Sequence, residues 1–258
     1  MKGPAGVLAL VLAETAAGSV AFLWLAPLWG KVRRGFFVLT GAILVVIALA
    51  AAGSAAAAAR DGASTAPQLS ALVLAGLIAA WTLVLAIRRD AIARWMGLAS
   101  VGVAGWSLIA FSASGEGSSA ASVFQLLAGA AFMGAVLDGL LLGHWYLVDR
   151  GLSRGPINAF AYSLLAAVVL ETIAVAMEGF GQIEAGSQFS SLLSAAGVAS
   201  YLAIGMVLAT GLIAVMIRLT LRGDRPAAVQ AATGFFYLAV ITAFAGEIAA
   251  KIRFLPQT

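Results

Sequence analysis

Six ionisable side chains lie inside or at the rim of stretches that are otherwise almost wholly apolar: Glu14, Asp138, His144, Glu171, Glu178 and Glu247. An ionisable group at the centre of a membrane helix costs at least ~2.5–3.5 kcal/mol on insertion scales. Chains that keep such groups use them to handle protons, ions or ligands, or to pair helices. These six positions are therefore where chemistry is expected.

The order of these groups along the predicted helices suggests a ladder of protonatable side chains. His144 and Asp138 are expected towards one membrane face, Glu171 near the middle and Glu14 in the opposite half. Glu14, Asp138, His144 and Glu171 are therefore the candidate proton-handling residues. The alternative is that each acid is neutral or hydrogen-bonded to a neighbouring helix and only holds the bundle together. No Lys or Arg lies at a span centre, so the deep acids are expected to lack a basic partner.

Two further pairs of candidate residues lie near the ends of predicted helices. His144 and Tyr146 flank a tryptophan, and aromatic side chains commonly anchor helices at the membrane surface. Both are candidate contacts for a quinone, and the alternative for His144 is a histidine at the level of the lipid headgroups. Glu247 and Lys251 are four residues apart, a spacing that predicts an ion pair on one helix face.

Several kinds of site are excluded by the residues that the chain lacks. It has no cysteine and one histidine, which rules out disulfides, thiolate zinc sites, cysteine-bound iron–sulfur clusters and bis-histidine haem within the chain. No phosphate-binding loop, dinucleotide-binding motif or hydrolase motif occurs in a usable context. No metal site and no catalytic cofactor site of its own are expected, and whether the chain takes part in an enzyme is left open.

The elements that must position these residues are membrane helices. Of the 258 residues, 62% are hydrophobic and 10% are charged, whereas soluble domains carry about 25% charged residues. The sequence predicts an all-α polytopic membrane protein with a single transmembrane domain over residues 1–258. Stretches of about 20 apolar residues span a bilayer, and eight are expected: 5–29, 36–59, 68–87, 95–113, 122–148, 158–179, 191–217 and 228–252.

The basic residues predict the orientation. Eleven of the fifteen Lys and Arg residues follow the first, third, fifth and seventh spans. The positive-inside rule then places both termini outside, and the same pattern explains the high isoelectric point without a nucleic-acid partner. Short loops favour antiparallel neighbours and are compatible with two four-helix groups, spans one to four and five to eight. The abundance of Ala and Gly suggests a GC-rich bacterial genome, so a bacterial inner (cytoplasmic) membrane is expected, with membrane lipid as one partner.

Small residues indicate where helices pack closely. Gly139 and Gly143 are four apart, the spacing of a close-packing seam, and Gly102 and Gly105 are candidates for another. The Ala-rich run at 48–59 is either a frayed helix end or a small-residue packing face. All six prolines sit at or near span ends, which argues against a transporter built on broken helices.

Both ends of the chain show a resemblance. Residues 13–18 read Ala-Glu-Thr-Ala-Ala-Gly, and residues 245–254 read Ala-Gly-Glu-Ile-Ala-Ala-Lys-Ile-Arg-Phe. These segments resemble the first and last helices of membrane-anchor subunits of dimethyl sulfoxide reductase-type complexes, the polysulfide/nitrite reductase anchor superfamily. By position, only Glu14 and Glu247 carry over. The chain departs from that family because its single histidine, His144, lies in the fifth span, which leaves a quinone site unplaced.

The resemblance implies a quinol-binding anchor with about eight spans and no metal of its own. Such an anchor docks on its outer face to an iron–sulfur or other redox partner subunit, which feeds a molybdenum subunit. The first hypothesis is therefore an integral membrane subunit of a respiratory oxidoreductase complex that binds quinol (menaquinone or ubiquinone) and passes its protons and electrons to partners. The alternatives are an accessory or scaffold subunit of a membrane complex and a proton-coupled small-solute transporter.

Overall fold

The computed structural model describes residues 3–59, 64–114, 119–149, 151–177, 195–223 and 226–252. Within these ranges the chain forms eight long helices and one short 3-10 turn, and no strand. Each long helix is long and apolar enough to cross a membrane. The elements are α1 (Gly3–Leu25), η1 (Ala26–Leu28), α2 (Arg34–Ala58), α3 (Ala66–Ala86), α4 (Asp90–Ala113), α5 (Ala120–Val148), α6 (Gly155–Met177), α7 (Ala195–Thr220) and α8 (Pro226–Ile252).

Within the described residues the predicted spans are confirmed as helices, with small shifts at their ends. Residues 178–179 of the sixth predicted span and 191–194 of the seventh lie outside the described residues. The first helix stops at Leu25 and tightens into η1, because Pro27 cannot continue an α-helix at this point. The fourth begins at Asp90 rather than at residue 95. An acidic side chain in the first turn favours helix formation by opposing the helix dipole, so the helix extends beyond the apolar run.

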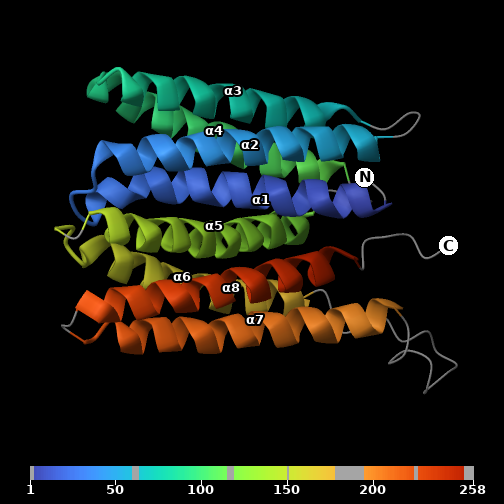
Figure 1. The fold of residues 1–258 in the computed structure, drawn as a ribbon. Coiled ribbons are helices and arrows are strands. Elements are labelled where there is room, and N and C mark those ends of the chain that lie inside the picture. The colour runs from blue at the N-terminus through green and yellow to red at the C-terminus, as the bar shows by residue number, and fades with distance from the viewer. Residues whose placement is uncertain are drawn as a thin grey trace, which may run out of the picture.

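The helices form two closed four-helix groups. In the first group α1, α2, α3 and α4 pack in sequence and α4 returns to α1. The same contacts recur in the second group, where α5, α6, α7 and α8 pack in sequence and α8 returns to α5. The groups meet mainly where α1 lies against α5 (Figure 1), with smaller contacts of α8 on α1 and of α4 on α5. The helices alternate in direction, so α1 and α5 run parallel.

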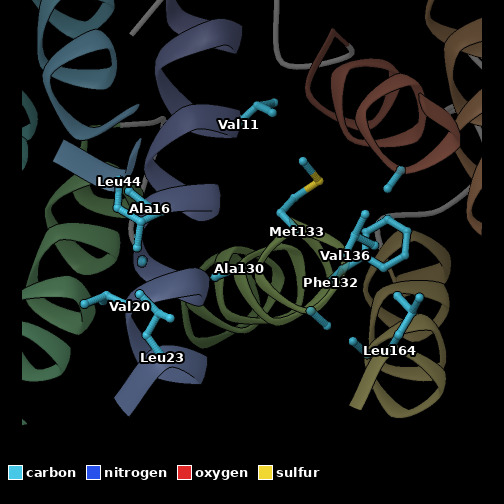
Figure 2. Close-up of a cluster of buried hydrophobic side chains, with 14 of the residues drawn as sticks. Val11, Ala16, Val20, Leu23, Leu44, Ala130, Phe132, Met133, Val136 and Leu164 are labelled. Atoms are coloured by element: carbon cyan, nitrogen blue, oxygen red, sulfur yellow. The ribbon is translucent and has the colours of Figure 1, made fainter. Parts of the chain in front are cut away.

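The contact between α1 and α5 depends on small residues. A Cβ atom added at Gly18 would lie 1.7 Å from the carbonyl oxygen of Ala130, and one added at Gly134 would lie 2.3 Å from the backbone of Gly18. The two backbones therefore touch, as small residues at membrane helix contacts allow. Figure 2 shows the apolar core on either side of this contact, with Val20 of α1 and Phe132 and Val136 of α5 among its side chains.

The close-packing predictions have mixed outcomes. Gly139 and Gly143 do form a seam, because a Cβ atom at either would lie within 2.5 Å of a side chain of α8, Phe236 or Thr233 respectively. The prediction for Gly102 and Gly105 is wrong, since nothing lies within 4 Å of a Cβ atom at either position. The Ala-rich run at 48–59 is helical to Ala58 and buries several of its alanines, so it is a packing face.

The two ends of the bundle differ in charge. The terminal end is where α1 begins and α8 ends, and the basic end is the opposite one, where α1 is joined to α2 and α3 to α4 (Figure 1). Arg33, Arg34, Arg88 and Arg94 all lie at the basic end. That the terminal end faces outward stays a prediction.

Candidate functional site

Three buried glutamates, Glu14, Glu171 and Glu247, lie around the ammonium group of Lys251. Its Nζ atom lies 2.8 Å from Oε1 of Glu14 on α1 and 3.3 Å from Oε2 of Glu247 on its own helix. The predicted pair between Glu247 and Lys251 is therefore confirmed. The expectation that the deep acids lack a basic partner is wrong for Glu14 and Glu171, which interact with Lys251, whereas Asp138 has no basic partner among the described residues. Side chains tilt towards the N-terminus of their helix, so a lysine in the last turn of α8 extends back into the bundle rather than out of it.

Glu171 of α6 completes this group. It interacts electrostatically with Glu14, Glu247 and Lys251, and Glu14 interacts with Glu247 in the same way. The exposed fractions are 0% for Glu14 and Glu247, 2% for Glu171 and 3% for Lys251. We call these four residues the carboxyl–lysine centre. The structure thus brings together two of the predicted proton-handling residues, Glu14 and Glu171.

The centre holds three acids and one base in a space closed to solvent. Oε2 of Glu14, Oε2 of Glu171 and Oε1 of Glu247 have no hydrogen-bond partner among the described residues. A buried ion without such partners costs several kcal/mol, and neighbouring carboxyls relieve this by sharing a proton, as in the aspartic-protease pair. One ammonium balances one carboxylate. No second cation accompanies the other two carboxyl groups among the described residues.

Gly129 of α5 provides the space for the carboxyls. A Cβ atom at this position would lie 2.7 Å from Oε1 of Glu14 and 2.7 Å from Oε1 of Glu247, so both oxygens border the same point. Any side chain at residue 129 would occupy the place where the two carboxyls meet. The fifth helix contributes no charge to the centre but determines how closely its acids approach.

Replacing Gly129 by Ala is expected to lower stability by about 1–3 kcal/mol, the usual range for overpacking. The new methyl group would push the carboxyls of Glu14 and Glu247 away from each other. Thermal unfolding of the purified protein in detergent measures the change. The matched control is Gly76→Ala, since nothing lies within 4 Å of a Cβ atom there. Equal melting temperatures for the two variants would contradict the described contact.

Asp138 lies elsewhere on α5 and is fully buried. Its neighbour across the contact between the two groups is Ser19 of α1, which interacts with its carboxyl. Neither carboxyl oxygen of Asp138, nor the hydroxyl of Ser19, forms a hydrogen bond of normal geometry with a described residue. Asp138 is thus a further buried acid at the contact between the two groups, and it lies apart from the carboxyl–lysine centre.

His144 and Tyr146, the candidate quinone contacts, lie near the basic end and have partners within the protein. Nε2 of His144 lies 2.5 Å from the hydroxyl of Tyr237 on α8, with the two rings edge to face. The Tyr146 hydroxyl donates to the backbone carbonyl of Ser153. These bonds occupy the polar atoms that would otherwise meet a quinone, and the role of both residues stays a prediction.

Glu178 lies outside the described residues. Across the ranges that the structure describes, no group of three or more His, Asp or Glu side chains is arranged to hold a metal ion.

Comparison with protein-family models, curated proteins and solved structures finds no match. The resemblance of the chain ends to the anchor subunits stays a prediction.

Proposed function

We propose that this protein is a proton-coupled membrane transporter of a small solute, and that the coupled proton binds at the carboxyl–lysine centre. The observation that carries the proposal is the position of the centre between the two four-helix groups. Glu14 belongs to the first group, and Glu171, Glu247 and Lys251 belong to the second. Transporters built from two similar halves place their substrate and coupling-ion sites where the halves meet.

Because of the ion pair between Lys251 and Glu14, the strength of the contact between the two four-helix groups depends on the charge of Glu14. The pair is a direct electrostatic link between the two groups, at 2.8 Å. A proton on Glu14 removes the charge that attracts Lys251, and Glu247 and Glu171 of its own group then hold the ammonium alone. Proton binding thereby changes how strongly the groups are held together, and a ligand or proton shifts a conformational equilibrium only through such a differential interaction.

The quinol-binding role remains the second candidate, supported by the resemblance of the chain ends. It requires a redox partner subunit and a quinone. The scaffold alternative treats the acids as helix contacts only. The same order of helix contacts in the two groups, with the centre between them, supports transport, because transporters built from two halves carry their coupling-ion site between the halves.

Neutralising Glu14 is expected to abolish proton-coupled transport. Currents are recorded from the purified protein in lipid vesicles on a solid support, with a pH gradient and a panel of small solutes: amino acids, sugars, organic acids and organic cations. We expect at least one solute to give a current that reverses with the pH gradient and is lost in Glu14→Gln. The matched control is Asp90→Asn, an acid whose side chain is 70% exposed and which lies outside the centre.

Two results would count against transport, and a third would count against the role of the centre. One is a proton-linked current of unchanged size in Glu14→Gln. The other is the absence of any solute-dependent current from wild-type protein across the whole panel. Loss of the current in both Glu14→Gln and Asp90→Asn would also contradict the proposal, because it would remove any special role of the centre.

A further inference from the structure

A groove of about 560 Å³ opens at the basic end of the first four-helix group. Its lining comes from the ends of α1 and α3, from η1, and from the beginnings of α2 and α4. Most of the wall is apolar, including Trp24, Phe37, Trp81 and Leu85. A second hollow of about 490 Å³ shares Trp24 and Arg94 with it. No residue of α5 to α8 lines either space, so both lie apart from the carboxyl–lysine centre.

The rim of the groove is polar and carries one uncompensated cation. Nη2 of Arg34 lies 2.7 Å and 2.9 Å from the two carboxylate oxygens of Asp90, so these two charges are paired. Arg94, which is exposed, forms no ion pair or hydrogen bond with another described residue. A guanidinium group in this situation is well suited to bind a phosphate.

The N-terminus of α2 strengthens the attraction for an anion. Helix α2 begins at this rim, and it has neither a side chain capping its first turn nor an acidic residue there. The first backbone N–H groups of a helix lack intrahelical acceptors and carry a partial positive charge. The groove thus combines an apolar wall with a rim that favours negative charge.

We propose that this groove binds an anionic phospholipid, with its phosphate at Arg94 and an acyl chain along the apolar wall. A soluble anion would make no contact with the apolar wall. A neutral lipid with a ring as its headgroup, such as a quinone, would leave the charge of Arg94 unpaired. The groove also lies at the level of the helix ends, where headgroups are found. Trp95, beside the second hollow, is 73% exposed, as interfacial tryptophans are.

Lipid retention tests this assignment directly. Protein is placed in nanodiscs of phosphatidylcholine containing a minor fraction of phosphatidylglycerol, then released into mild detergent and examined by native mass spectrometry. Wild-type protein is expected to retain phosphatidylglycerol above its share of the bilayer. Replacing Arg94 by Gln is expected to weaken this retention about fivefold, since one basic residue near the surface contributes about that factor. Arg94→Lys is expected to keep most of it.

The matched control is Arg222→Gln, which removes an exposed arginine at the same end of the bundle but outside the groove. It is expected to retain lipid as wild type does. Equal retention of both lipids by wild-type protein, or an equal loss in Arg94→Gln and Arg222→Gln, would overturn the proposal. So would a bound quinone whose retention is independent of Arg94. None of these readouts involves transport, so the outcome is independent of the proposed function.

Discussion

Replacing Lys251 by Met is expected to destabilise the protein by about 3–5 kcal/mol at neutral pH, the usual effect of removing one partner from a buried ion pair. The ammonium lies 2.8 Å from Glu14 and 3.3 Å from Glu247, and it is 3% exposed. Without it, three buried carboxyls have no cation nearby. Thermal unfolding in detergent, followed by circular dichroism, measures the loss.

A second substitution separates charge balance from packing. In Lys251→Met/Glu14→Gln both charges of the pair are gone, and replacing a whole buried pair by neutral groups is often tolerated. We therefore expect the double variant to recover most of the stability that the single variant loses. The deficit of the single variant is also expected to shrink as the pH falls, because protons from solvent then neutralise the acids that lost their cation.

The control is Lys31→Met, which removes an exposed lysine at the basic end and is expected to change stability by less than about 0.5 kcal/mol. The account fails if Lys251→Met is as stable as Lys31→Met. It also fails if the double variant is no more stable than the single one, since the loss would then come from packing alone.

Replacing Gly18 by Ala is the second substitution with a large expected effect. The new methyl group would lie 1.7 Å from the carbonyl oxygen of Ala130 and 2.5 Å from its carbonyl carbon. Both are backbone atoms, so a change of side-chain rotamer cannot relieve the clash and α1 must move away from α5. We expect a loss of about 3 kcal/mol or more, at or beyond the upper end of the range for overpacked cores.

The matched control for this variant is Gly105→Ala on α4, where nothing lies within 4 Å of the added atom. That variant is expected to be neutral or up to about 1 kcal/mol more stable, because Ala favours the helix. Unfolding temperatures of the two variants in one detergent give the comparison. Similar values would mean that the two helices are not in backbone contact at Gly18.

The long apolar helices were predictable because their signal is local. Length and apolar composition define each span, and the structure has a helix at every predicted stretch. The two four-helix groups were compatible with the short loops. Which helices join the groups was not predictable: the Gly18–Ala130 contact depends on two residues more than a hundred positions apart, and small residues occur throughout the chain.

The candidate site was predictable only in part. Acids inside apolar stretches identified Glu14 and Glu171 because ionisable groups are costly there. Lys251 was expected near the end of the last span because it lies in the last turn of that helix. This expectation left out the direction of the side chain, which tilts back towards the N-terminus of the helix. The contact of Lys251 with Glu14 also requires α8 to lie beside α1, and no local pattern indicates that. Gly129 gave no signal, since its role depends on two carboxyls from other helices.

If the carboxyl–lysine centre holds exchangeable protons, infrared spectroscopy detects them most directly. Difference spectra of the protein in lipid are recorded across a pH jump, and the band of protonated carboxyls is compared between variants. We predict a band that is diminished in Glu14→Gln and Glu171→Gln and kept in Asp90→Asn, which changes an exposed acid outside the centre. A band unaffected by the first two substitutions, or no protonated carboxyl at any pH at which the protein is folded, would contradict the assignment of proton binding to this centre.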